Sequence, residues 1–246
     1  MKKRLLVLGL AFTMLAATAC GTSSYNGNKT SKADKTVTAT SDNDKTSEIQ
    51  KNDDKKDDAK ESYKSADDIT MDDLKNHEET PAEDFEYADG PDGSVVIEGY
   101  TGEDPIVVIP NEIDGKKVVD FGKIFTNNKD IVAVRVGDNV ENIKEGAFGN
   151  CDNLKYIILG KNVKVFEHGN VGGKKFEQLE LNDGLEQLGE EGTSGAVIIL
   201  NKDKVEVKIP ESVNHMAFTG AKTLIVKAGS YAESFAKEHN MDYRVE

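Results

Sequence analysis

Three segments in the middle of the chain repeat one pattern of apolar residues, and this repeat constrains the fold more than any other feature. Each segment has apolar side chains at its first, fourth and sixth positions, and successive segments start 23 and then 22 residues apart. Self-similarity at such a period is typical of proteins built from stacked units. One unit cannot cover its own apolar side, so neighbouring units share a continuous core. The segments are 131–136, 154–159 and 176–181.

The similarity continues beyond each segment, which indicates that the repeating unit is longer than one strand. Turn-forming residues such as Gly137-Asp138-Asn139 and Asn182-Asp183-Gly184 follow the segments. The pattern predicts a strand with three side chains inward and its third and fifth positions on an exposed face. Further copies contain Val107, Val207 and Leu224. The apolar positions after each turn are Val140, Val163 and Leu185, followed by Ile143, Phe166 and Leu188.

The best-formed unit runs from Ile143 to Leu159 and reads I-K-E-G-A-F-G-N-C-D-N-L-K-Y-I-I-L. It resembles the bacterial surface-antigen class of leucine-rich repeats, often called BspA-like, whose repeat reads I-x-x-x-A-F-x-x-C-x-x-L-x-x-I-x-L-P. The resemblance covers residues 85–246. It implies a leucine-rich repeat solenoid, mostly β with short turns or helical segments. It also implies that Cys151 is an inward corner residue, packed beside Phe148 and Leu154.

A terminal unit of a solenoid exposes its core, so both ends of the repeat domain need caps. The resemblance implies an opening hairpin over about 85–104 and a C-terminal capping helix over about 230–239. The spacing of Tyr231 and Phe235 fits one face of that helix, with Ser230 as its N-cap. Residues 189–204 are predicted to be an insertion, in which 197–200 suggest an extra hairpin.

Residues 1–19 have the organisation of a secretory signal peptide. Three basic residues precede an apolar run over 5–15 and small residues over 16–19. The run is too short for a transmembrane helix, which needs about 20 apolar residues. The segment that ends at Cys20 resembles the bacterial lipoprotein lipobox, although Ala17 stands where that motif usually has Leu. We predict that Cys20 is lipidated, and secretion without lipid is the alternative.

Residues 20–84 begin with this cysteine and continue as a segment almost without large apolar side chains. Such a segment cannot bury enough apolar surface to offset its ordering entropy, which predicts a disordered polar tail. A short helix over 69–77 would have Met71 and Leu74 on one face, which is too thin to be stable alone. Residues 85–246 remain for one domain, long enough to bury about 70% of its unfolded surface.

The chain is acidic, with a formal net charge of −14 and no basic stripe. Nucleic acid and anionic lipid head groups are therefore poor candidates for partners. Cys20 and Cys151 are the two cysteines. If Cys20 is lipidated, no intrachain disulfide can form, and the exported domain depends on packing.

No set of residues in the sequence matches a catalytic or metal-binding motif. The four histidines are not in an H-E-x-x-H pattern or beside a plausible nucleophile. G-x-S-x-G, Walker A and dinucleotide-binding patterns are absent from the sequence. We therefore predict no catalytic residues, no cofactor and no metal, and a hydrolytic enzyme is retained as a further alternative. The histidines are His77, His168, His215 and His239.

The exposed face of the predicted strands is the candidate binding surface. Its first half is apolar around Arg135, and its second half is polar. A contiguous exposed apolar patch usually marks an interaction site, and Tyr and Arg are enriched in interface cores. The alternative is that the opening hairpin or a second copy of the chain covers the patch. The predicted binding residues are Val108, Arg135, Tyr156, Ile158, Gln178 and Glu180.

These features predict a lipid-anchored binding protein on the outer side of a bacterial membrane. Cys20 would hold it to the bilayer, the tail would act as a spacer, and the repeat domain would bind a protein or glycan. The family resemblance implies adhesion or host-surface interaction. The alternative is a structural protein that uses the strand face as a homodimer interface.

Overall fold

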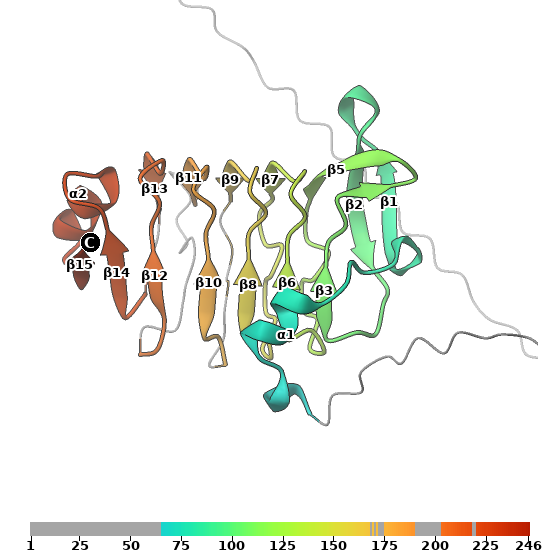
Figure 1. Cartoon of the computed structure of the whole chain (residues 1–246), viewed down its shortest axis with the longest axis horizontal. Helices are drawn as coiled ribbons and strands as arrows, with labels where there is room; N and C mark the ends of the chain where they lie inside the picture. Colours follow the sequence, from blue (N-terminus) through green and yellow to red (C-terminus); the bar gives the residue numbers. More distant parts are fainter. Residues whose placement is uncertain (1–64, 168, 170, 172–174, 190–202, 218–219) are drawn as a thin grey trace, which may run out of the picture. The chain divides into compact units, whose positions relative to one another are not determined.

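The computed structural model describes residues 65–246, except 168, 170, 172–174, 190–202 and 218–219 (Figure 1). All of these residues belong to one compact unit, Asp58–Glu246. The predicted signal peptide, Cys20 and the hairpin expected at 197–200 lie outside the described residues.

The repeat segments form a parallel sheet on one side of the unit. Its strands are ordered β10-β8-β6-β3. The central residues Val107, Val134, Ile157 and Leu179 are direct partners across the ladder, so each coil adds one strand in the same register. The bounds are β3 (Ile106–Val108), β6 (Ala133–Arg135), β8 (Tyr156–Ile158) and β10 (Gln178–Glu180).

A second sheet is formed where each coil returns on its other side. Phe121, Ile143, Phe166, Leu188 and Met216 are successive partners along its parallel part, which makes a second inward column. The strands of this part are β5 (Lys116–Phe121), β7 (Asn142–Ile143), β9 (Val165–Phe166), β11 (Gln187–Leu188) and β13 (His215–Met216). β4 (Glu112–Ile113) pairs with β5 in antiparallel fashion.

The ends of the described coils carry different structures. At the start, β1 (Phe85–Asp89) and β2 (Val95–Tyr100) form an antiparallel hairpin around a 3₁₀ helix, η3 (Pro91–Gly93), and β2 pairs with β5. At the other end, β12 (Glu206–Lys208), β14 (Thr223–Val226) and β15 (Tyr243–Val245) form a third, parallel sheet. Helix α2 (Tyr231–Glu238) follows its N-cap Ser230, whose Oγ accepts a hydrogen bond from the Glu233 amide at 3.2 Å. Its Ala232, Phe235 and Ala236 are buried against the core.

Stacked aromatic rings fill the core between the first coils. The ring centroids of Phe125 and Phe148 are 5.7 Å apart, and Phe148 also lies 6.1 Å from both Phe121 and Phe166. Each coil contributes one short strand on each side of this shared core. The central positions Val134, Ile157 and Leu179 are 23 and 22 residues apart, and the arrangement is that of a leucine-rich repeat solenoid. The structure therefore confirms the fold class predicted from the repeat.

The segment before β1 differs from the expected polar tail. Residues 65–84 contain 3₁₀ helices η1 (Ala66–Asp68) and η2 (Ala82–Asp84), and between them helix α1 (Met71–Asn76). Ile69 and Leu74 of this segment are fully buried. The ordered part of the chain thus begins well before residue 85, because this segment finds an apolar surface to pack on.

Candidate functional site

Residues 65–80, which we call the strap, run along the strand face of the first sheet. Helix α1 lies against β6 and β3, in front of the sheet in Figure 1. The strap therefore occupies the face that the sequence predicts to be a binding surface.

Local sequence explains how the strap forms its short helix. Thr70 is the N-cap: its amide donates to Asp73 Oδ2 at 2.7 Å, and its Oγ1 accepts from the Asp73 amide at 3.3 Å. The Thr70 hydroxyl also donates to Asp73 Oδ2 at 2.6 Å, and this bond together with that from the Thr70 amide lowers the pKa of Asp73. Ile69 before the cap and Leu74 in the first turn belong to the same buried cluster, as in a hydrophobic staple. A helix of six residues is not stable in isolation, so α1 depends on the sheet beneath it.

The apolar contact of the strap centres on two side chains. Ile69 and Leu74 pack in one cluster with Ile106, Ala133 and Tyr156. Full burial of a side chain of this size contributes about 1.5–3 kcal/mol relative to exposure. The cluster is separate from the main core of the solenoid.

Two cations of the solenoid hold the backbone of the strap. The buried Lys155 donates from Nζ to the carbonyl oxygens of Ile69 at 2.9 Å and Asp67 at 3.3 Å. Arg135 donates from Nη2 to the carbonyl oxygen of His77 at 2.6 Å. The carbonyls offset part of the cost of burying these charges.

The end of the strap extends the edge of β3. The Thr80 amide donates to the Val108 carbonyl at 3.0 Å, and the Val108 amide donates to Thr80 Oγ1 at 2.9 Å. Nearby, Asn111 Nδ2 donates to Glu79 Oε1 at 2.7 Å. These bonds satisfy an edge that would otherwise present unpaired backbone groups.

The structure divides the predicted binding residues into two groups. Val108 and Tyr156 are buried, and Ile158 packs against the cluster under the strap. Arg135 is half-buried and bonded to the strap. The apolar half of the face is therefore covered in this structure by upstream residues of the same chain, and not by the opening hairpin. The signal for this contact was the order Ile69, Thr70, Asp73, Leu74, a capping box with its staple.

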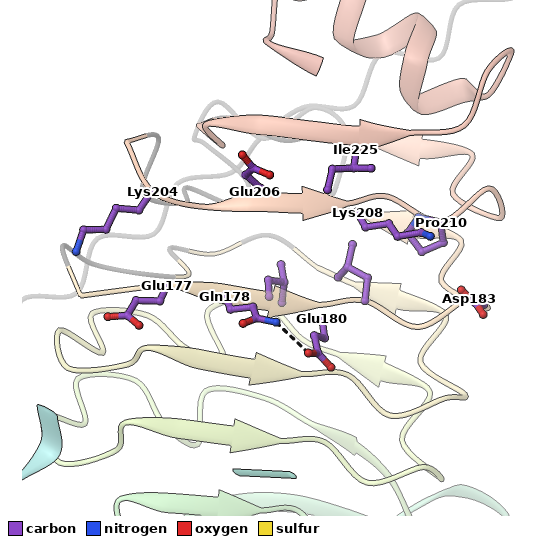
Figure 2. Close-up of a pocket in the computed structure, with 11 residues that line it drawn as sticks. Glu177, Gln178, Glu180, Asp183, Lys204, Glu206, Lys208, Pro210 and Ile225 are labelled. Atoms are coloured by element: carbon purple, nitrogen blue, oxygen red, sulfur yellow. Dashed lines mark hydrogen bonds between the residues drawn. The ribbon is translucent and has the colours of Figure 1, made fainter. Parts of the chain in front are cut away.

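Gln178 and Glu180, the second group, lie beside a hollow of about 510 Å³ on the same face (Figure 2). The hollow lies where the first sheet ends at β10 and the third begins at β12. The central residues Leu179 and Val207 are 28 positions apart, against 27 between Val107 and Val134 and 23 and 22 in the two coils that follow Val134. The lining residues are Glu177, Gln178, Leu179, Glu180, Leu181, Asp183, Lys204, Glu206, Lys208, Pro210 and Ile225.

The hollow combines carboxylates, two lysines and an apolar floor. Gln178 Nε2 donates to Glu180 Oε1 at 2.9 Å, and Lys75 Nζ of the strap lies 2.8 Å from the same oxygen. Lys208 forms an ion pair with Glu246, and the hydrogen bond that Lys208 donates to this carboxylate raises the pKa of Lys208. The Lys75–Glu180 pair joins the strap to the rim of the hollow.

Cys151 lies in the main core with Phe148 and Leu154, as the family resemblance implies. Its Sγ donates to the Phe125 carbonyl at 3.0 Å, and burial raises the pKa of the thiol to about 12. We expect Cys151 to react with a disulfide reagent at pH 8 only after unfolding, because reaction requires an accessible thiolate. The measurement is thiol titration of a Cys20→Ser variant with and without denaturant. Rapid labelling of the native protein would contradict the prediction.

No cluster of metal-ligating or catalytic groups emerges in the part of the chain that the structure describes. Within these residues, no three His, Cys, Asp or Glu side chains gather as a metal site. His77 Nε2 is 3.6 Å from Asp104 Oδ2, whereas His239 stacks on Phe235 at the other end of the unit. His168 lies outside the described residues. Over the same residues, no helix has the length and apolarity to cross a membrane.

Comparison with known proteins gives structural likenesses only. No protein-family model and no curated protein matches the chain. A leucine-rich repeat protein of T. pallidum is similar in structure, with 26% identity and a TM-score of 0.49, over 60% of this chain and 71% of that protein. One from Bacteroides ovatus has 18% identity and a TM-score of 0.43, over 60% and 49% of the respective chains. One from Bacteroides capillosus has 18% identity and a TM-score of 0.38, over 61% and 98%.

The stacked coils themselves define the fold class, which is a leucine-rich repeat solenoid. Folds of this class place their interaction surfaces on the faces of the stacked strands. On that face, the hollow beside β10 and β12 is open, whereas the strap covers the apolar cluster.

Proposed function

We propose that this chain is a non-catalytic binding protein of the BspA-like type, which binds a protein partner through the hollow beside β10 and β12. The observation that carries the proposal is that the hollow is the part of the strand face the strap leaves open. A glycan partner is the alternative outcome of the same binding experiment.

The charges of the hollow support a protein partner. Glu177, Glu180 and Glu206 line it together with Lys204 and Lys208, and Ile225 supplies an apolar surface between them. Complementary charges across an interface contribute mainly to specificity and association rate. The preferred partner segment would therefore be extended, with Lys or Arg side chains opposite the three glutamates and an apolar residue over Ile225.

The hollow can be tested with one substitution and a matched control. Ile225→Arg places a long charged side chain in the hollow, whereas Val245→Arg makes a comparable change at an exposed position of β15, outside it. The probe is a panel of labelled extended peptides that vary in Lys and Arg content, with neutral oligosaccharides as a second panel. We expect Ile225→Arg to weaken peptide binding by ten-fold or more and Val245→Arg to leave it within two-fold. Equal affinities for both variants and the wild type would exclude the hollow.

The proposal includes export and attachment at the outer side of a bacterial membrane through acylated Cys20. Support comes from the basic, apolar and small residues that precede this cysteine. Buried acyl chains contribute about 0.8 kcal/mol per CH₂ group, so two chains suffice for stable anchoring. Mass spectrometry of the mature N-terminus distinguishes an acylated Cys20 from a secreted form without lipid.

A further inference from the structure

We propose that the apolar strand face beneath the strap is a docking site for a short amphipathic helix, and that the strap is its occupant in cis. A partner segment with the chemistry of the strap replaces it: an apolar residue, an N-cap Thr or Ser, an acidic residue three positions later and then a second apolar residue. This site borders the hollow at the Lys75–Glu180 pair, and the inference stands independently of the proposed function.

The outward side chains of the sheet change from apolar to polar between β8, which the strap covers, and β10. Outward positions under the strap carry Ile106, Ala133 and Tyr156, and these pack on Ile69 and Leu74. The equivalent positions of β10 and β12 are polar and at least partly exposed. The apolar residues under the strap are thus matched to an apolar occupant, whereas β10 and β12 present polar side chains. The polar positions are Gln178, Glu180, Glu206 and Lys208.

The site recognises backbone more than side-chain identity. Lys155 holds two carbonyl oxygens, of Asp67 and Ile69, and Arg135 holds that of His77. The edge of β3 also receives the backbone amide of residue 80. Any segment can present these carbonyl groups, so only the two apolar positions and the two residues of the capping box need a particular residue type. This is the helix-in-groove form of peptide recognition, reduced to a single short helix.

The strap is built to exchange. Its helix is too short to persist away from the sheet, so it folds and docks in one step. Its rim contacts are weak, because Lys75 and Glu180 have side chains 47% and 34% exposed, and Lys175 and Asp67 are 45% and 76% exposed. A unit with so few buried residues opens at a lower free energy than the stacked coils. Arg135 Nε is buried and has no hydrogen-bond partner among the residues that the structure describes.

The first test measures exchange in trans. In the full chain, Ile69→Glu with Leu74→Glu removes the apolar contacts of the strap and leaves the solenoid core unchanged. The probe is a fluorescent synthetic peptide with the sequence of residues 65–80, followed by anisotropy. We expect it to bind this variant at least ten-fold more tightly than the wild type, because the strap no longer competes. A peptide with Glu at both apolar positions should not bind, and Asn76→Glu, a charge on the exposed side of α1, should behave as wild type.

The second test needs no variant. In the wild-type chain, the amides of Leu74 and Thr80 donate to carbonyls of the strap and of β3, whereas Val136 and Leu159 donate within the stacked coils. Hydrogen exchange at Leu74 and Thr80 should be at least ten-fold faster than at Val136 and Leu159. Equal protection at all four amides would overturn the proposal and make the strap a permanent cap. A folded double variant that fails to bind the peptide, or that self-associates instead, would also overturn it.

Discussion

Replacement of Phe148 by alanine should lower the free energy of unfolding by about 3–5 kcal/mol, the usual range for loss of a fully buried phenylalanine. The ring is 1% exposed. It stacks on Phe125 and meets Phe121 and Phe166 edge-on, so it contacts aromatic side chains from the coils on both sides. Loss of the ring would leave a cavity between the coils. Because the strand pairing of the neighbouring coils holds them in place, we expect them to move little into this cavity.

Urea denaturation followed by far-UV circular dichroism measures this loss. Phe148→Leu keeps most of the volume and should cost less than about 1.5 kcal/mol. Tyr87→Ala is the exposed aromatic control, since its ring is 39% exposed on β1, and it should cost less than about 1 kcal/mol. A loss below about 1 kcal/mol for Phe148→Ala would show that the aromatic column does not hold the coils together.

Gly160→Ala should be the most damaging glycine substitution in the stacked coils. A Cβ atom at this position would lie 2.1 Å from the Gly137 carbonyl oxygen and 2.9 Å from that of Val136. Both obstacles are backbone atoms of the preceding coil, so no side-chain rotation can relieve the overlap. The two coils must move apart, against ladder bonds such as the 2.9 Å bond from the Val136 amide to the Ile158 carbonyl. Overpacking typically costs about 1–3 kcal/mol, and we expect the upper end of that range or more.

Gly122→Ala is the matched control for this substitution. A Cβ atom there would meet only the Lys144 Cβ, at 4.0 Å, which is ordinary contact. The same urea titration should therefore leave Gly122→Ala within about 0.5 kcal/mol of wild type. If both glycine variants have the same midpoint, the close approach of Gly160 to Gly137 does not limit how the coils stack.

The columns of the solenoid could be predicted from particular residues. Val134, Ile157 and Leu179 recur at spacings of 23 and 22 residues, and they occupy equivalent rungs of one ladder. Phe166 and Leu188 recur in the same way on the return strands. A repeat leaves few choices, because each unit must bury the same positions against the unit before it.

The candidate site was predictable only in part. The outward positions of Tyr156 and Glu180 followed from strand alternation. That Tyr156 is buried while Glu180 borders a hollow did not follow, because each depends on a segment from another part of the chain. Ile69 covers the first, and the second lies where the first sheet ends at β10 and the third begins at β12.

The sequence by itself determined the coiled architecture, the inward columns and the direction in which each strand residue points. These properties repeat from coil to coil. Because each coil buries the same positions against the coil before it, the coils stack in one register. The tertiary structure alone decided which part of the strand face is covered and which part is open. The contacts of Ile69 and Leu74 join the strap to strands far along the sequence. They occur once in the chain, so the repeat pattern does not predict them.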